Sequence, residues 1–570
     1  MRQTILSLFF LVPYFVFCQN IKFKTLSTDD GLSNNSVNDI ISDKDGVLWI
    51  ATWDGLNLYD GHNFTVYKHI QNDSTSIFGN VIIKFLKDVK DNIWILTDNK
   101  SVSTYTGKGK FKNYVFKNQP EKLLLSKTGE LIVKGSEEGK YYKFKKDGFV
   151  ESSIENVKQR NHTSLYSILL SKHPHLIINE SLQDSYGNIW YATKNKGLYV
   201  IPNNASNINN EDIEHYEYDL YSPYSFTSNE IEKLYEDSFG NIWLGHKDGG
   251  LSMAYKGSQQ INTITPHPIK FPNLPNETIR AITKDFNNAI WLGYYTQGLF
   301  YYSQEHKSYI KYEIPKQLKN NDWDRIRSLF TSTDGSIWAG TYAGLIRIKD
   351  GKSLFYKPSE YENFPNGRNY SLFEDNKKQL WISCWSGLAK FNLNTEKFEA
   401  FEGQEDLIDF NIRNVTAIED EVLLSSEDKG AMLLNTTTGN ISRIDIGKGI
   451  LGNSVYNVFK DDMTQYYWIA SLGGISVYDK EKGLIKNMTE KDGLPSHMVY
   501  SLLLNNDKVW ISTTKGIAAV DRNDYSVWSL NMNEGWQATE FSEGSYYQDR
   551  KGTLFFWRYK WVELFLTYKY

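Results

Sequence analysis

The chain has 570 residues, more than a single hydrophobic core usually holds, so its length predicts several domains or a long repeat array. Aromatic residues make up 15% of it, with 16 Trp and 38 Tyr against 13 Pro, which is typical of an ordered, strand-rich protein and excludes a disordered one. The 63 Lys and Arg are scattered among 68 Asp and Glu, giving a net charge of −5. This balance excludes the extended basic surface that a nucleic-acid-binding protein needs.

The first residues resemble a secretory signal peptide, with Arg2 followed by an apolar run over 5–17 and polar sequence from Gln19. We expect residues 1–18 to be a signal peptide cleaved near Cys18. A lipoprotein is the alternative, although the bulky Phe17 argues against a lipobox, and the run is short for a membrane anchor. Cys384 would then be the one remaining cysteine, and its strand-like surroundings predict a buried, inert thiol rather than a disulfide or a nucleophile.

One segment recurs along most of the chain and organises it. Residues 43–52 (DKDGVLWIAT) return as residues 184–193 and 237–246, each with Gly and Trp at matched places. Further copies centre on Trp94, Trp291, Trp338, Trp381, Trp468 and Trp510, and three copies lack the Trp, at 129–132, 421–424 and 549–555. Twelve units with a period of about 45 residues are typical of four-stranded propeller blades. The predicted fold is all-β: tandem β-propellers built from about twelve four-stranded blades.

The first unit shows how four strands follow from the sequence. Apolar runs at 37–41, 48–52, 56–59 and 64–67 predict the strands, and the turn residues between them separate each strand from the next. In the first turn, Asp43 can bond turn amides and Gly46 tolerates a positive φ, while Trp49 would fill the wedge between neighbouring blades. The Asp-x-Asp-Gly of this turn lacks the other ligands of a calcium loop. We therefore expect these residues to be structural, with no metal and no cofactor.

At this point a family resemblance emerges. Residues 30–37 (DGLSNNSV), followed by 46–52 (GVLWIAT) and 55–57 (GLN), resemble the two-component regulator propeller repeat, as do 492–496 (DGLPS) before 510–513 (WIST). The resemblance implies a periplasmic sensor of Bacteroidota, of the kind found in hybrid histidine kinases that respond to glycan fragments. It also implies two consecutive propellers with about fourteen repeats, then a three-Tyr immunoglobulin-like domain, a membrane helix and cytoplasmic signalling domains.

Equal partition of the repeats predicts a first propeller over 19–315 and a second over 316–570, with an incomplete last blade. Residues 21–27, alone before the first full unit, look like an outer strand that closes a ring with a later blade. The wide gap between Ile132 and Trp190 could hold one more degenerate blade.

The sequence from Trp557 onward abandons the repeat where a Gly should follow. Removing one T from the preceding Phe codons permits a reading that restores this Gly, which suggests a one-nucleotide frameshift that truncates a longer regulator. The membrane helix, kinase core and DNA-binding domain implied by the resemblance would then be missing, so the chain could sense but not signal alone. An incomplete blade would leave strand edges unpaired and favour aggregation.

Resequencing the gene through the codons of Phe555 and Phe556 tests the frameshift. We expect a run of T that, one nucleotide shorter, opens a longer reading frame. An intact frame with an ordinary stop codon would contradict it.

No Walker loop, dinucleotide fingerprint, zinc helix or nucleophile elbow occurs, and the ten His form no ligand-spaced cluster, so we expect a binding protein rather than an enzyme. We predict the ligand site in the loops that follow the strands containing the repeat Trp, because loops at one face of a propeller often contain the residues that recognise a ligand. Their aromatic and polar side chains suit the C–H face and hydroxyls of a sugar ring, or alternatively only cap blades. The candidates are Trp53, Asp54, Asn195, Asp248, Tyr294, Tyr295, Tyr342 and Trp385, with Lys194 and Lys247 beside them.

The leading hypothesis is a periplasmic glycan-sensing region of a two-component regulator without its own kinase or DNA-binding domain. The expected partner is an oligosaccharide, with a homodimer left open, no nucleic acid, and the membrane reached only through missing C-terminal regions. The first alternative is a protein-interaction propeller without a small ligand. The second is a polysaccharide lyase or glycoside hydrolase, because propellers also carry such enzymes.

Overall fold

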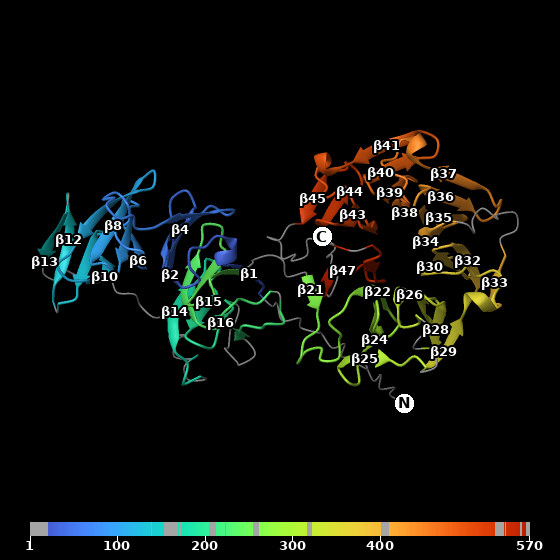
Figure 1. The fold of residues 1–570 in the computed structure, drawn as a ribbon, viewed down its shortest axis with the longest axis horizontal. Helices are drawn as coiled ribbons and strands as arrows, with labels where there is room; N and C mark the ends of the chain where they lie inside the picture. The colour runs from blue at the N-terminus through green and yellow to red at the C-terminus, as the bar shows by residue number, and fades with distance from the viewer. Residues whose placement is uncertain are drawn as a thin grey trace, which may run out of the picture. The chain divides into compact units, whose positions relative to one another are not determined.

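The computed structural model describes residues 21–565 apart from residues 138, 147, 153–168, 170–172, 204–212, 223, 255–260, 316–317, 319–321, 401–409, 531–540, 542 and 559–560. The described part consists of two compact units, one over residues 21–220 and 224–254 and one over 261–565 (Figure 1). Residues 221–222 belong to the second unit. The expected signal peptide, residues 1–18, lies outside the described residues.

The described residues of the first unit form five four-stranded antiparallel sheets, in the strand orders β2-β3-β4-β5, β6-β7-β8-β9, β10-β11-β12-β13, β14-β15-β16-β17 and β1-β20-β19-β18. The strands are β1 (Phe23–Leu26), β2 (Val37–Ser42), β3 (Leu48–Thr52), β4 (Gly55–Tyr59), β5 (Phe64–Tyr67), β6 (Ile82–Lys87), β7 (Ile93–Thr97), β8 (Ser101–Gly107), β9 (Lys110–Val115), β10 (Pro120–Leu125), β11 (Leu131–Gly135), β12 (Tyr141–Lys145), β13 (Gly148–Ser152), β14 (Ile178–Gln183), β15 (Ile189–Thr193), β16 (Leu198–Ile201), β17 (Glu214–Tyr216), β18 (Ile231–Glu236), β19 (Ile242–His246) and β20 (Leu251–Ala254).

The described residues of the second unit form seven such sheets, six from consecutive strands between β22 and β45 and one in the order β21-β48-β47-β46. The strands are β21 (Ile261–Ile264), β22 (Ile279–Lys284), β23 (Ile290–Tyr294), β24 (Gly298–Ser303), β25 (Ser308–Tyr312), β26 (Ile326–Thr331), β27 (Ile337–Thr341), β28 (Leu345–Lys349), β29 (Lys352–Tyr356), β30 (Asn369–Glu374), β31 (Gln379–Cys384), β32 (Gly387–Asn392), β33 (Lys397–Glu399), β34 (Ile412–Ile418), β35 (Glu421–Ser426), β36 (Ala431–Asn435), β37 (Ile441–Ile444), β38 (Val455–Lys460), β39 (Tyr467–Ser471), β40 (Gly474–Asp479), β41 (Gly483–Met488), β42 (Leu503–Asn505), β43 (Lys508–Thr513), β44 (Gly516–Asp521), β45 (Val527–Leu530), β46 (Tyr546–Gln548), β47 (Leu554–Arg558) and β48 (Trp561–Phe565).

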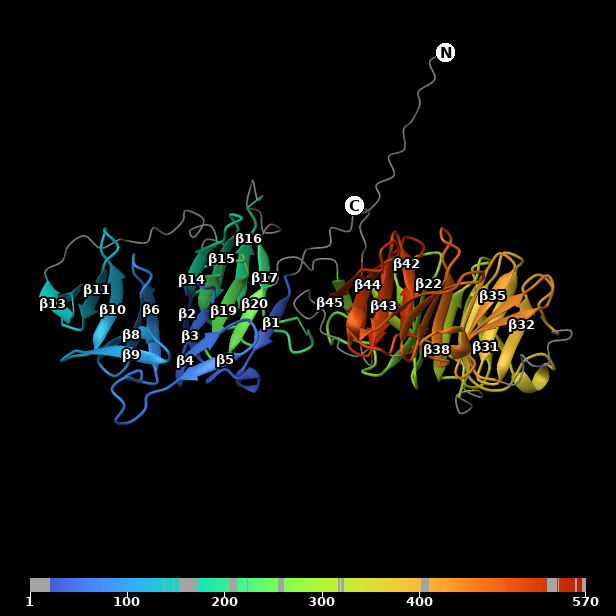
Figure 2. The same cartoon turned by 90° about the horizontal axis from the view of Figure 1, so that it is seen from above.

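These seven sheets close into a ring, with β22, β26, β30, β34 and β38 among the strands nearest its centre (Figure 1). β46 contacts both β42 and β22, which joins the last sheet to the first. Figure 2 shows the same ring from the side, with its strands packed as successive blades. The twelve sheets among the described residues confirm the predicted all-β fold and its count of units.

Each unit is completed by a strand from its own N-terminal side. β1 pairs with β20 in the register Phe23↔Ala254 to Leu26↔Leu251, which confirms the predicted outer strand over 21–27. β21 pairs with β48 in the same way, from Ile261↔Phe565 to Ile264↔Val562. A sheet closed by a segment distant in sequence couples the two ends of its unit.

The structure corrects two expectations about domain boundaries. The units divide within residues 255–260, well before residue 315, because the sheet of β22–β25 packs against β26 and β46 of the second ring. The last sheet is also complete rather than missing a strand, because β47 and β48 pair with each other and β48 pairs with β21. Because backbone hydrogen bonding does not require the repeat sequence, β48 and β21 pair with the strand edges that were expected to be unpaired in the last sheet. The described strands between Ile132 and Trp190 belong to the sheets of β10–β13 and β14–β17, and the residues between β13 and β14, where an extra blade was suggested, lie mostly outside the described residues.

A recurring clamp between Asp and Trp positions the sheets. Asp43 Oδ1 accepts hydrogen bonds from the amides of Asp45 and Val47, both at 3.0 Å, and Gly46 has a φ of +84°. Asp43 Oδ2 accepts from the Trp49 indole at 3.0 Å. The same carboxylate–indole bond, 2.8–3.2 Å long, occurs in the pairs Asp88–Trp94, Asp184–Trp190, Asp237–Trp243, Asp285–Trp291 and Asp375–Trp381. The predicted structural roles of these residues are confirmed.

The clamped indole lies in the core that its sheet shares with the next one. Trp49 packs with Ile82, Phe85 and Ile95 of the following sheet, and Trp291 packs with residues of β26–β28 in the same manner. Where Phe555 replaces the Trp, Asp549 keeps its turn bonds and its Oδ2 accepts instead from Lys284 Nζ of the neighbouring sheet at 2.8 Å. The carboxylate therefore keeps a partner when the indole is absent.

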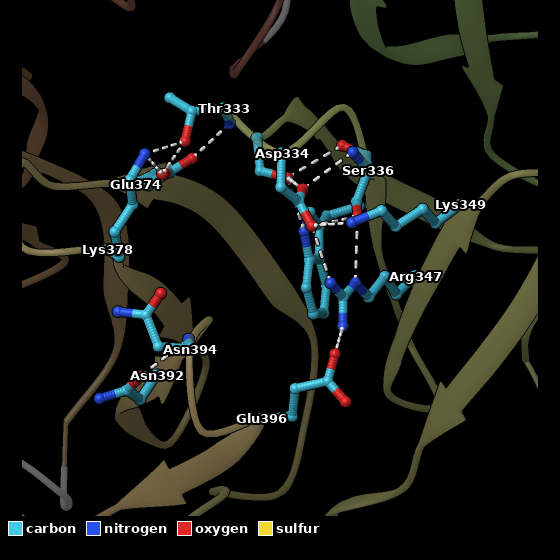
Figure 3. Close-up of polar contacts among 12 residues, drawn as sticks. Thr333, Asp334, Ser336, Arg347, Lys349, Glu374, Lys378, Asn392, Asn394 and Glu396 are labelled. Carbon is cyan, nitrogen blue, oxygen red and sulfur yellow. Dashed lines mark hydrogen bonds and ion pairs between the residues drawn. The ribbon is translucent and has the colours of Figure 1, made fainter.

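In the sheet of β26–β29 a serine takes the place of the clamp aspartate. The Trp338 indole donates to Ser332 Oγ at 3.2 Å, and the negative charge moves to Asp334 (Figure 3). Asp334 Oδ2 accepts from the buried Arg347 at 2.8 Å and from Lys349 at 2.9 Å. Although burial opposes its ionisation, hydrogen bonds from Lys349, Ser332 and Arg347 hold the pKa of Asp334 far below its ordinary value. This network at the turn end of the blade is structural.

The Asp-Gly-Leu motif forms a capped turn at Gly31 in the first unit and at Gly493 in the second. Each turn is a short 3-10 helix, η1 (Thr28–Asp30) or η7 (Glu490–Asp492), that ends at a Gly with a positive φ, +105° at Gly31 and +102° at Gly493. The following Leu32 and Leu494 are buried. Two further 3-10 turns are η4 (Pro358–Glu360) and η6 (Ile446–Lys448). A residue with a Cβ would strain this turn, which explains the Gly of the motif.

In every sheet except that of β46–β48, the last residue of the second strand is buried, and its identity varies. Thr52, Thr193, Thr341 and Thr513 occupy this position and donate Oγ1–H to a nearby Gly carbonyl. Cys384 occupies it in β31, where burial raises the pKa of its thiol, which confirms the predicted buried, free thiol. His246 occupies it in β19, where burial lowers its pKa from 6.5 to about 4.

Within the described residues, no helix is long and apolar enough to cross a membrane.

The buried His246 predicts a pH dependence of stability. Its folded-state pKa is depressed, so its contribution is complete above pH 6.5 and is lost as the pH falls from 6.5 to about 4. The shift corresponds to about 3 kcal/mol in the free energy of unfolding. We expect His246→Thr, which restores the residue found in other repeats, to flatten the stability profile over this range in urea titrations. An unchanged slope in the variant would show that His246 is not the group responsible.

Candidate ligand-binding site

The predicted site residues of the first unit lie in the loops after β3, β15 and β19, as expected. Trp53 is 58% exposed and donates its indole N–H to Asn38 Oδ1 at 3.0 Å, while Asp54 forms an ion pair with Lys68 at 2.5 Å. Asp248 accepts from Ser36 Oγ at 3.2 Å, and Asn195 is exposed on β15's loop. The Trp53 amide also donates to the Ser36 carbonyl, so Trp53 and Asp248 meet at Ser36.

Tyr294 is the predicted site residue that the structure removes from the set. It is the last residue of β23, 0% exposed, and belongs to a core cluster with Leu292 and Phe300. Burial raises the pKa of its phenol. Sequence reasoning placed Tyr294 in the loop because the strand end was misjudged by one residue, and Tyr294 holds the buried position occupied by Thr elsewhere.

The structure brings the other three candidates of the second unit together. Tyr295, Tyr342 and Trp385 follow β23, β27 and β31 of successive sheets, and the ring centroids of Tyr295 and Tyr342 are 5.8 Å apart. The Arg325 guanidinium lies 4.7 Å from the Tyr295 ring and 4.0 Å from the Tyr342 ring. Arg368 lies 4.7 Å from Tyr342 and 5.6 Å from Trp385. The result is a row in which aromatic rings and guanidinium groups alternate.

The row continues toward the centre of the ring. Trp385, 40% exposed, stacks on Tyr370 with ring centroids 5.7 Å apart. The Arg327 guanidinium lies 4.6 Å from the centroid of the same Tyr370 ring. Arg280 lies 5.3 Å from the Tyr295 ring, at the first end of the row. We call the set Arg280, Tyr295, Arg325, Arg327, Tyr342, Arg368, Tyr370 and Trp385 the arginine–aromatic row.

A repeated β-bulge explains how the row reaches inward. In the second unit the innermost strands β22, β26, β30, β34 and β38 each shift register after their first residue, so the second residue is left out of the ladder, as at Ile279/Ala281 and Ile326/Ser328. These bulge residues in the second unit are Arg280, Arg327, Tyr370, Arg413 and Tyr456. A bulge re-aims a side chain, so the same end of five neighbouring sheets presents these residues together.

Contacts between sheets that are not neighbours show that these side chains point into the ring. Glu543, just before β46, forms ion pairs with Arg327 of β26 at 3.3 Å and with Arg413 of β34 at 2.7 Å. Tyr546 of β46 bonds Asn414 of β34 at 2.7 Å and also bonds Asn457 of β38. Such contacts can form only across the centre of the ring.

The electrostatics of the site reflect its excess of cations. Burial, together with the charge of Arg327, lowers the pKa of the Arg280 guanidinium below its ordinary value. The hydrogen bond from Arg325 lowers the pKa of the Tyr295 phenol. Within the described residues, no group of three or more His, Cys, Asp or Glu is arranged to hold a metal ion. The arrangement can bind and orient a ligand through stacking and charged hydrogen bonds.

Sequence reasoning missed all the arginines of this site. A usable signal was present: Ile-Arg occurs at 279–280, 326–327 and 412–413, each time where an innermost strand begins. The Ile-Arg signal was missed because regular alternation along the strand does not point this Arg toward the ring centre. Only the bulge turns the second residue of the strand in that direction.

The fold is that of a tandem β-propeller protein, and the arginine–aromatic row lies at one end of its second ring. Residues 31–54 match the sequence model of the two-component regulator propeller family. This agrees with the resemblance seen in the sequence.

Two known proteins are similar over most of the chain. Histidine kinase P4 of Formosa agariphila is 26% identical over 90% of this chain, which spans about half of that protein, 48% of its length. The extracellular domain of the hybrid two-component system BT3049 from B. thetaiotaomicron has a similar fold, with a TM-score of 0.66 and 19% identity. That match covers 96% of this chain and 83% of the other.

Glu543 should contribute to stability because it is the shared partner of two buried arginines. Arg327 and Arg413 side chains are 6% and 13% exposed. We expect Glu543→Gln to lower the free energy of unfolding by about 1–3 kcal/mol, since it leaves both cations without this charge. Urea denaturation measures the change.

Asp322→Asn is the matched control, because Asp322 pairs with Arg325 while its side chain is 55% exposed. We expect a change within about 0.5 kcal/mol. Equal effects of the two substitutions would contradict the buried, bridging role of Glu543.

Proposed function

We propose that this chain is the extracytoplasmic ligand-sensing region of a two-component regulator, that it acts in the periplasm, and that its ligand is a glycan. The observation that carries the proposal is the arginine–aromatic row, because exposed aromatic faces beside fixed hydrogen-bond donors suit a sugar ring and its substituents. The regulator propeller repeat and the likeness to a histidine kinase support the signalling context.

The proposed role is binding rather than catalysis. Seven sheets closed by β21 hold Tyr342 on one blade and Arg368 and Trp385 on the next, so the groups that would contact a ligand are positioned before it arrives. A ligand that prefers one arrangement of the protein shifts its population toward that arrangement. Transmission to a kinase would be the task of segments such as those in the unmatched half of the longer histidine kinase relative.

A thermal-shift screen of the chain from Gln19 against plant, host and algal oligosaccharides tests the proposal. A ligand at a hundred times its dissociation constant should stabilise the folded state by about 2.7 kcal/mol. We expect one selective class of hits, lost in Trp385→Ala because the stacking face is removed.

Trp528→Ala is the control, since Trp528 is similarly exposed, 47% against 40%, but lies on the outer strand β45. It should leave the shift unchanged. A folded protein that responds to no saccharide but to a specific protein would favour an interaction propeller. New sugar ends released from a saccharide, and lost on changing a carboxylate, would identify an enzyme instead.

A further inference from the structure

We infer that the glycan bound at the arginine–aromatic row is acidic, and that Arg280 and Arg368 each hold a carboxylate or sulfate group of it. This inference rests on the proposed function and names its ligand class. Neither guanidinium has a carboxylate partner among the described residues, whereas each of the other three arginines at this end of the ring has one. The pairs are Arg325–Asp322, Arg327–Glu543 and Arg413 with Glu427 and Glu543.

Arg280 carries the clearest sign of an unmet interaction. Its Nε is buried and has no hydrogen-bond partner in the described structure. Partial burial and the neighbouring charge of Arg327 disfavour its charged form more than nearby groups such as Glu543 favour it, so its pKa is lowered. A partly buried cation with an unsatisfied N–H is costly, and an anion bound beside it would reduce that cost through charge-assisted hydrogen bonds.

Arg368 is held in an orientation that suits an anion. Its guanidinium lies between the faces of Tyr342 and Trp385, at 4.7 Å and 5.6 Å. Stacking occupies the face of a guanidinium and leaves its in-plane N–H groups, which bind carboxylate or sulfate in a bidentate manner. The exposed Trp385 beside it offers a face for the sugar ring that carries the acid.

The first unit shows that the cation excess does not follow from the fold itself. Its bulge residues occupy the same strand position, yet none is basic: they are Asn38, Ile83, Glu121, Asn179 and Glu232. The charges beside them are paired, because Lys233 bonds Glu180 at 2.8 Å and Asp39 at 3.3 Å. The arginines without a carboxylate partner among the described residues, Arg280 and Arg368, therefore mark a site specific to the second unit.

The test is isothermal titration calorimetry of the purified chain with pairs of saccharides that differ only in charge. Oligogalacturonate is compared with its methyl ester, and sulfated algal oligosaccharides with their desulfated forms. Sodium sulfate and free glucuronate serve as further ligands, to separate a saccharide site from a site for a bare anion. We expect an acidic oligosaccharide to bind and its neutral form to bind at least about tenfold more weakly.

Arg280→Gln and Arg368→Gln should each weaken acidic binding at least about tenfold, since each removes a charge-assisted contact. Arg443→Gln is the matched control, because Arg443 lies on the outer strand β37 with a side chain 43% exposed, and it should bind as the parent does. Arg368 is the second variant in case Arg280→Gln fails to fold.

The outcomes separate this inference from the proposed function. Equal or better binding of the neutral forms, or acidic binding unchanged in both arginine variants, overturns the acidic class and leaves glycan sensing intact. Sulfate alone binding as tightly as any saccharide overturns the glycan ligand and leaves only an anion site. A folded chain that binds none of these ligands overturns both.

Discussion

The Asp carboxylate of each regular repeat accepts hydrogen bonds from two turn amides and from the indole that follows, and this clamp determines where one sheet lies against the next. The indole is held at its polar edge and buried over its apolar surface, so it has one position in the wedge between sheets. Where the clamp changes, the charge is still satisfied: Lys284 replaces the indole at Asp549, and Arg347 and Lys349 bind Asp334 where Ser332 stands in for the aspartate.

Ring closure is the second constraint, and it is non-local. A four-stranded sheet of a propeller buries both faces only between two others, so the first and last sheets of the second unit meet, with β46 beside β22. In the second unit β21 fills the outer edge of the sheet of β46–β48, which ties residues 261–264 to residues 561–565. This pairing removes two exposed edges at once and makes the ring a rigid frame for the side chains at its centre.

The candidate site is a variation on this frame. The bulge at the start of an innermost strand recurs in both units, in five sheets of each, while the residue placed there differs. In the second unit arginines and tyrosines occupy it, and loop aromatics one strand further along each blade extend the cluster outward. Binding specificity can therefore change by single substitutions at the bulges without disturbing the clamps that maintain the ring.

Much of this organisation follows from the sequence alone. The Asp, Gly and Trp of the repeat determine the turn, the second strand and the buried wedge, because each acts over a few neighbouring residues. The isolated apolar segment before the first repeat predicts a strand that completes a later sheet. Tertiary structure alone decided the rest. The division of sheets between two units, the completion of the last sheet by β21, the burial of Tyr294 and the meeting of Arg280, Arg368 and Trp385 all depend on which distant segments pack together. Local patterns specify strands and turns, but the angular position of a sheet around a ring is set by packing and closure, which no local pattern encodes.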